Sequence, residues 1–245
     1  LCGIIGTIAS NLPIHLSPES HRFFRLLVDQ GFLLAPILGV GTFIFPRLLG
    51  GSFGDPESPA SKKQVLLTSL FAAALLVASF AIEAYSSLTM GRILRAAAFV
   101  IVLTPVPWRR QSDGITLGTL ANGLRFLFLP LALIGITAAI FQPVLRVSLD
   151  HILFIGGFGL VCLLVASRVI FGHCGQMPAF QHRSTIARLI LTLVVASVIL
   201  RAFSNVLSDQ PEALQHASAW TWLGATLTYL IWQGKRLFTR DPDDH

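Results

Sequence analysis

Long apolar runs dominate the chain, and short polar segments separate them. The runs are apolar on every side and do not alternate, so they predict helices and not the strands of a transmembrane barrel. A helix needs about 20 mostly apolar residues to span a bilayer, and about seven runs qualify. They lie near residues 23–46, 65–84, 88–106, 117–140, 149–172, 185–207 and 215–234. The pattern therefore predicts an all-α, polytopic transmembrane bundle that forms a single domain over residues 1–245.

Basic residues gather in alternate loops, and this asymmetry predicts an orientation. We call the membrane side that holds the C-terminus side B and the opposite side side A. The side A loops receive Arg22, Arg146 and few other basic residues. The side B loops receive Arg47, Lys62, Lys63, Arg109, Arg110, Arg183, Lys235, Arg236 and Arg240. Because lysine and arginine concentrate in cytoplasmic loops, we expect a multi-pass membrane protein with a cytoplasmic C-terminus.

The composition supports a membrane location. Apolar residues make up 53% of the chain and charged residues only 12%, whereas an ordinary soluble domain carries roughly 25% charged residues. In water the excess apolar surface would aggregate, so the expected partner is the lipid bilayer. The net charge of +6 does not indicate nucleic-acid binding, because the basic residues form no patch or stripe.

The first residues resemble the tail of an apolar helix. The chain starts at Leu1 and not at a methionine, and the segment 1–10 is too short to span a membrane. It also lacks the basic flank of a signal peptide. We therefore expect that some N-terminal helices of a longer protein precede this segment.

Histidines near the predicted helix ends are the first candidates for chemistry. His21, His151 and His216 fall on side A, and His173 and His182 fall on side B. Neutral imidazole is a common ligand for haem iron and for copper. His151 and His173 lie roughly 33 Å apart along one helix, so they cannot bind the same metal ion. Each histidine also has an ordinary interpretation as a polar residue at the membrane interface.

A second candidate follows the fifth run. His173, Cys174 and Met177 offer an imidazole, a thiol and a thioether within five residues, and soft sulfur ligands favour copper(I). The same segment is also typical of a polar turn that ends a helix at a glycine. Arg168 precedes it and is costly at membrane depth unless paired. This arginine either compensates the negative helix end or holds a negative group beside His173.

Charged residues and glycines inside the runs form a third group. Glu83 ends the second run, and Arg92 and Arg95 follow on one face of the third, so we predict an ion pair across the turn. Its role is structural, or the arginines hold haem propionates. The glycines of segment 156–159 let helices pack closely or let a flat cofactor lie against the helix.

Three stretches together resemble the NnrS family of bacterial membrane proteins. One is the glycine-rich segment 31–47, which ends in Pro46-Arg47. The second runs from Asp150-His151 through a glycine-rich helix to the segment 167–175, which contains Gly-His-Cys-Gly. The third is the helix 186–205, with Arg201 near its end. The resemblance covers most of residues 20–235.

The resemblance implies a haem- and copper-containing protein of the bacterial inner membrane that is linked to nitric oxide and nitrosative stress. His151 and His173 are the histidines that match the family pattern. The chain departs from the pattern in two ways: it is shorter, and Cys174 stands where a hydroxyl residue is expected. Both departures bear on the metal content. Together with the arguments from topology and donor chemistry above, the cofactor-binding candidates are His151, His173, His216, His21 and Arg168, and the copper candidates are His173, Cys174 and Met177.

Two other functions remain open. A metal-free transporter or permease would have helices broken at mid-membrane, and Pro130 and Gly135 are the residues that hint at such a break. A purely structural subunit is the third possibility. No phosphate-binding loop, zinc-protease motif, nucleophile elbow or buried carboxylate pair appears in the chain. The sequence thus leaves open whether the protein is an enzyme.

Overall fold

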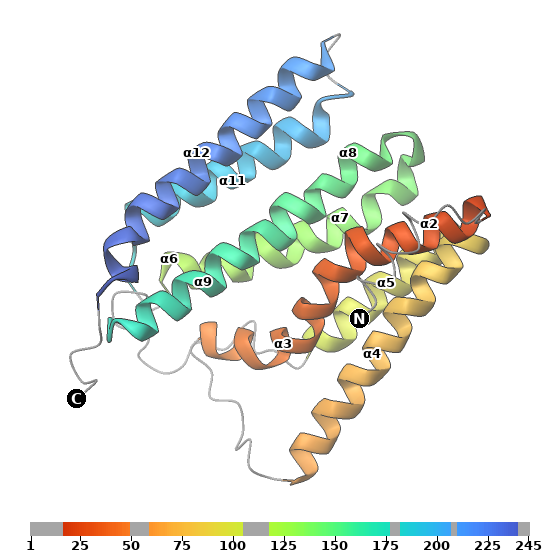
Figure 1. Cartoon of the computed structure of the whole chain (residues 1–245), viewed down its shortest axis with the longest axis horizontal. Helices are drawn as coiled ribbons and strands as arrows, with labels where there is room; N and C mark the ends of the chain where they lie inside the picture. The colour runs from red at the N-terminus through yellow and green to blue at the C-terminus, as the bar shows by residue number, and fades with distance from the viewer. Residues whose placement is uncertain (1–16, 50–58, 105–117, 177–181, 207–209, 240–245) are drawn as a thin grey trace. The chain divides into compact units, whose positions relative to one another are not determined.

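The structure is a computed structural model that describes residues 17–49, 59–104, 118–176, 182–206 and 210–239 (Figure 1). The described residues form helices and contain no strand, so the predicted all-α class is confirmed. The π-helices and one 3-10 helix carry η labels. The elements are α2 (Pro18–Leu26), η1 (Leu27–Gly31), α3 (Phe32–Leu48), α4 (Pro59–Tyr85), α5 (Leu88–Leu103), α6 (Thr119–Gly123), η2 (Leu124–Phe128), α7 (Leu129–Phe141), η3 (Pro143–Leu145), α8 (Arg146–His151), η4 (Ile152–Gly159), α9 (Leu160–His173), α11 (Thr185–Phe203) and α12 (Pro211–Leu237).

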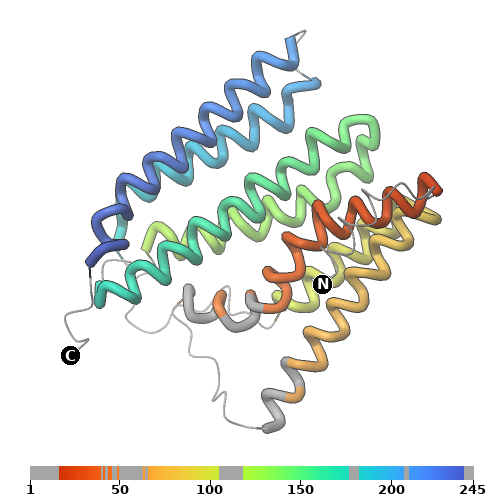
Figure 2. Tube along the Cα trace, viewed as in Figure 1, coloured from red at the N-terminus to blue at the C-terminus, as the bar shows by residue number. Residues whose placement is uncertain are grey.

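Every predicted apolar run contains a helix, and the chain can be followed through them in Figure 2. Among the described residues, four helical stretches are long and apolar enough to cross a membrane. They are Leu66–Tyr85, Thr119–Phe141, Pro143–His173 and Thr185–Phe203. Helix α5 has 16 residues, which is fewer than the about 20 that a full span needs. The membrane character is therefore supported, and the predicted count of about seven spans is not confirmed.

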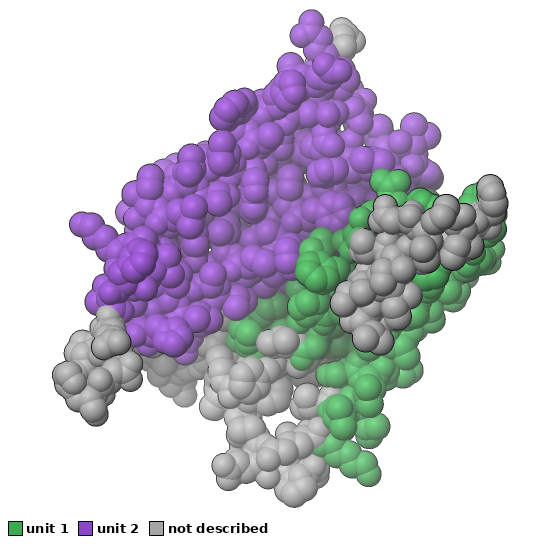
Figure 3. Space-filling view, viewed as in Figure 1, with its two compact units in different colours: residues 1–47, 52–107 green, residues 48–51, 108–245 purple. Residues whose placement is uncertain are grey.

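The chain divides into two compact units, shown in different colours in Figure 3. The first unit comprises residues 1–47 and 52–107, and the second comprises residues 48–51 and 108–245. In the first unit α4 packs along α5, and α2 packs against α4. In the second unit α7 packs against η4, and α11 lies beside α12. The sequence predicted that residues 1–245 form a single domain. Whether the two units together form that domain stays a prediction.

The crossing of α4 and α5 in the first unit depends on a glycine. The Ser87 hydroxyl accepts a hydrogen bond from the backbone amide of Met90 and so caps α5. A Cβ atom at Gly91 would lie 2.5 Å from the Cβ of Glu83 and 2.7 Å from the carbonyl oxygen of Ser79. Only a residue without a side chain allows this approach. The close crossing brings Glu83 next to the arginines of α5.

The helices of the second unit continue through π-helical segments. The stretch Thr119–Phe141 is one helix that includes η2, and Pro130 comes just after this π-helical segment. Proline lacks the backbone amide that an α-helix would use at that position. A Cβ atom at Gly135 would collide with the backbone of Leu153, so this glycine lets α7 approach η4. Pro130 and Gly135 therefore lie within a continuous helix, and neither marks a break.

Candidate functional site

One end of the second unit gathers the start of α8, the end of α11 and the start of α12. The Asn205 side-chain amide donates a hydrogen bond of 2.7 Å to the Ser148 hydroxyl, which ties the end of α11 to α8. The Ser197 hydroxyl lies 2.9 Å from the carbonyl oxygen of Ser218, which fixes α11 against α12. We call this end the α8–α11 end. It corresponds to side A of the predicted topology.

The α8–α11 end contains three of the residues considered above. His151 closes α8, and Arg201 lies one turn beyond Ser197 on α11. His216 lies two residues before Ser218 on α12, and its side chain is exposed. Three elements separated in sequence thus bring two histidines and one arginine to the same end of the second unit.

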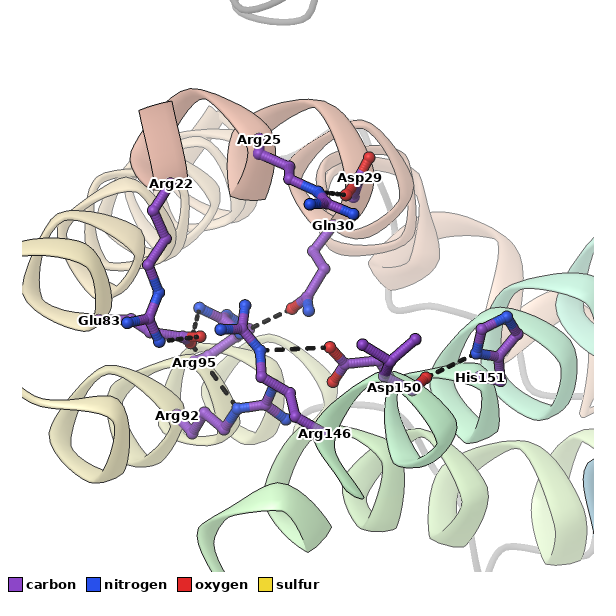
Figure 4. Close-up of polar contacts among 11 residues, drawn as sticks. Arg22, Arg25, Asp29, Gln30, Glu83, Arg92, Arg95, Arg146, Asp150 and His151 are labelled. Atoms are coloured by element: carbon purple, nitrogen blue, oxygen red, sulfur yellow. Dashed lines mark hydrogen bonds and ion pairs between the residues drawn. The ribbon is translucent and has the colours of Figure 1, made fainter. Parts of the chain in front are cut away.

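His151 is held by a hydrogen bond to the main chain (Figure 4). Its Nδ1 atom lies 2.6 Å from the carbonyl oxygen of Val147. Because a carbonyl oxygen only accepts, Nδ1 carries the proton, and Nε2 keeps its lone pair. The ring is half-buried and meets the edge of Phe154, with 5.8 Å between ring centroids. The same pattern orients histidines that bind metals through their other nitrogen, so Nε2 is available for a ligand.

An apolar cluster lies beside His151. Ile152, Val198 and Ala202 are buried together, and their partly buried neighbours are Leu131, Leu149 and Ile155. Ile152 directly follows His151, and Ala202 directly follows Arg201. His151 and Arg201 are therefore sequence neighbours of one apolar cluster, formed by Ile152, Val198 and Ala202, which we call the Ile152 cluster.

Side chains occupy the space beside the glycines of η4. A Cβ atom at Gly156 would lie 3.1 Å from Val198, and one at Gly159 would lie 2.5 Å from the Trp222 ring. Of the two interpretations of this glycine run, close helix packing is the one that the structure shows at these two positions.

The opposite end of the second unit contains His173 and Cys174. The Cys174 side chain is buried, and its thiol donates to the carbonyl oxygen of Arg236 at 2.9 Å. Nε of Arg236 donates to the side-chain oxygen of Gln176 at 3.1 Å, and its guanidinium carbon lies 4.8 Å above the Phe171 ring. These contacts join the end of α9 to the end of α12. The thiol therefore has a structural partner in addition to its candidate role as a ligand.

The other candidates near Cys174 in the sequence are His173, Met177 and Arg168. His173 is exposed, and Met177 lies outside the described residues. Arg168 is partly buried, and one of its terminal nitrogens would lie 3.3 Å from a Cβ atom at Gly172. The described ranges contain no group of three or more His, Cys, Asp or Glu residues that could hold a metal ion. Copper binding at this segment stays a prediction.

The first unit contains a buried polar cluster (Figure 4). Nη2 of Arg95 lies 2.8 Å from Oε2 of Glu83, and Nε of Arg92 lies 3.8 Å from the same oxygen. The ion pair predicted across the turn is therefore confirmed. Arg22 also faces Glu83 at 3.6 Å, and the side-chain oxygen of Gln30 accepts from Nη1 of Arg95 at 2.6 Å. His21 lies near this cluster in sequence, but its side chain is exposed.

The match to a protein family extends over nearly the whole chain. A family model described as NnrS protein matches residues 1–240. The chain belongs to the NnrS family. No curated protein and no solved structure matches it. The resemblance carried by the segments 31–47, 150–175 and 186–205 is therefore confirmed, and the match includes residues of both units.

Sequence reasoning missed several contacts of this NnrS protein. Gln30 is a single polar residue inside an apolar run, and its position in the π-helix η1 gave no periodic signal. The bond from His151 to Val147 joins a side chain to a backbone atom, so residue types alone cannot reveal it. The spacing of four residues could have suggested it, because residues four apart are neighbours on a helix.

Proposed function

We propose that this NnrS protein binds haem through His151 and acts in the response to nitric oxide and nitrosative stress. The observation that carries the proposal is the hydrogen bond from Nδ1 of His151 to the carbonyl oxygen of Val147. This bond directs the second ring nitrogen away from the main chain. A neutral histidine with one nitrogen so occupied is the usual proximal ligand of haem iron.

The surroundings of His151 suit a haem group. The buried Ile152 cluster makes the neighbourhood of His151 apolar, which suits the haem macrocycle. The half-buried position of the ring limits access of water. When bound, haem supplies an iron atom that can take a small diatomic ligand. The chain's own residues would orient that group and hold it within the membrane.

His216 is the candidate for a second ligand at the α8–α11 end. It lies on α12, the helix beside α11, and its exposed side chain has room to turn. His21 belongs to the first unit, and its participation stays part of the proposal. Arg168 and His173, near the other end of the second unit, would serve a separate site.

The copper part of the proposal rests on donor chemistry. His173, Cys174 and Met177 supply the soft ligands that copper(I) prefers. Binding there requires the Cys174 thiol to release the carbonyl oxygen of Arg236. Copper content measured in Cys174→Ser and in the wild-type protein tests this site. Equal copper content in both would withdraw Cys174 as a ligand.

The visible absorption spectrum of the protein purified in detergent tests haem binding. We expect a Soret band in the wild-type protein and its loss or shift in His151→Ala. His182→Ala is the matched control, because His182 is exposed and has no proposed role. Circular dichroism shows whether each variant is folded. A folded wild-type protein that gains no Soret band with added haem would contradict the proposal and favour the metal-free transporter.

A further inference from the structure

Arg201 is a charged residue inside a candidate membrane span. It lies in the last turn of α11, within the stretch Thr185–Phe203, and its side chain is partly buried. A charge at membrane depth is costly, so such residues are normally paired or line a functional site. Its position therefore calls for a negative or polar partner.

The described residues of the second unit supply no such partner to Arg201. The ion pair found there joins Arg146 to Asp150 at 3.6 Å. The side-chain amide of Asn205, one turn further along, is used by Ser148. Arg201 is close enough to His151 to act on it electrostatically, but an imidazole cannot neutralise a guanidinium group.

Arg188, on the same helix, shows the contrast. Its side chain is exposed, and Nη2 donates to the Thr185 hydroxyl at 3.1 Å. Arg188, near the start of α11, is therefore exposed and has a hydroxyl partner. Arg201 has neither full exposure nor a hydrogen bond from its side chain to the described residues.

We propose that Arg201 binds an anionic oxygen group, a carboxylate, on the ligand that His151 holds. This inference rests on the proposed haem function and assigns a contact within that site. The arginine fork matches the two oxygens of a carboxylate. The hydrogen bond between Asn205 and Ser148 joins α11 to α8. Arg201 lies four residues before Asn205 and His151 three residues after Ser148, so both lie on the faces that this bond brings together. The buried Ile152 cluster makes this neighbourhood apolar, and a ligand with an apolar body and carboxylate arms would suit it. Haem has this composition through its propionates.

A titration with two forms of the cofactor tests the assignment. The purified protein is titrated with haem and with haem dimethyl ester, whose propionates are uncharged, and the Soret band is followed. We expect the wild-type protein to bind haem at least about tenfold more tightly than the ester, as for a charge-assisted hydrogen bond. In Arg201→Gln this preference disappears, and in the control Arg188→Gln it remains. Arg201→Lys keeps the charge without the fork and is expected to show an intermediate preference.

The outcomes separate the two proposals. Haem binding with an unchanged preference in Arg201→Gln would overturn the role of Arg201 and leave the function intact. Absence of haem binding in the wild-type protein would overturn both. Inorganic phosphate tests a free oxyanion as the alternative source of the same chemistry. If phosphate raises the melting temperature of the wild-type protein but not of Arg201→Gln, while the haem preference is unchanged, Arg201 binds a free anion and the propionate assignment fails.

Asp209 provides a further control, because it follows α11 in sequence and lies outside the described residues. If Asp209→Asn lowers the melting temperature as much as Arg201→Gln, and neither alters the haem preference, Arg201 pairs with Asp209. That result would overturn the assignment to the ligand.

Discussion

At Glu83, one carboxylate faces three guanidinium groups of the first unit. Glu83, Arg92 and Arg95 are fully buried, so their charges depend on one another and not on water. A second carboxylate–guanidinium pair lies at the surface: Nε of Arg25 is 3.3 Å from Oδ2 of Asp29, and both side chains are exposed. The buried pair at Glu83 and this exposed pair therefore have the same chemistry in different environments. Breaking a buried pair leaves an uncompensated charge, whereas an exposed pair contributes little.

We therefore expect Glu83→Gln to lower the free energy of unfolding by about 3 kcal/mol or more. The matched control Asp29→Asn is expected to change it by less than about 1 kcal/mol. Thermal or denaturant unfolding in detergent measures both. If the two substitutions lowered the free energy of unfolding equally, the burial of Glu83 would not add to the stability that its ion pairs provide.

Two buried glutamines are expected to have opposite effects on the free energy of unfolding when each is replaced by leucine. Gln233 on α12 is fully buried, and neither atom of its amide has a hydrogen-bond partner in the described part of the chain. Gln30 is equally buried but accepts from Arg95 at 2.6 Å. An unsatisfied buried amide costs stability, and an apolar side chain of similar shape removes that cost.

Accordingly, Gln233→Leu is expected to raise the free energy of unfolding by about 1 kcal/mol or more. Gln30→Leu is expected to lower it by about 2 kcal/mol, because it removes a hydrogen bond to a charged group. The melting temperatures of the two variants give the signs directly. A loss of stability in Gln233→Leu would mean that its amide has a partner within the membrane.

At the level of elements, the packing of α4 against α5 depends on the absence of a side chain at one position. A Cβ atom at Gly91 would meet the Ser79 carbonyl oxygen, a backbone atom that cannot rotate away. Gly224 on α12 has open space in the same position, with no atom within 4 Å. The same substitution should thus have different effects on the two helices.

Gly91→Ala is expected to destabilise the protein by about 2 kcal/mol or more, because α4 and α5 must separate. Gly224→Ala is expected to be neutral or to stabilise by up to about 1 kcal/mol, since alanine favours the helix. Melting temperatures of both variants in detergent check the difference. A neutral Gly91→Ala would show that the two helices are not so closely packed.

The sequence predicted the helices well because each run is long and apolar, and the Glu83–Arg95 pair because both residues flank a short turn. It could not predict the π-helical segments η1, η2 and η4. Their register depends on how neighbouring helices pack and not on local composition. For the same reason it identified His151 as a candidate but not the Val147 carbonyl that orients its ring.

For the whole molecule, the distribution of charge predicts how the protein lies in the membrane. In the described second unit the two acidic residues are Asp150, next to the last residue of the short helix α8, and Glu212, in the first turn of α12. The basic residues Arg183, Lys235 and Arg236 lie at the other end. At the α8–α11 end Arg146 and Arg201 balance the two acidic residues, whereas no described acidic residue balances the basic ones at the other end. Lysine and arginine favour the cytoplasmic side, so the α8–α11 end is expected to face outward.

Reporter fusions check this orientation. Fusions near residues 55, 112 and 178 are expected to report a cytoplasmic location, and a fusion near residue 145 is expected to report an external one. The physical reason is the excess of basic residues in the loops on side B. A cytoplasmic signal near residue 145, with external signals at the other three positions, would reverse the topology.

The bond that holds His151 has a consequence for how this region tolerates genetic change. The acceptor is a main-chain oxygen, so any side chain at position 147 leaves it in place, and the Val147 side chain is exposed. Missense changes at position 147 should therefore be silent for His151. The insertion or deletion of a single codon between 147 and 151 would rotate the ring about a quarter turn around the helix, about 100°. The constraint on this segment is thus one of length, and substitution data alone would not reveal it.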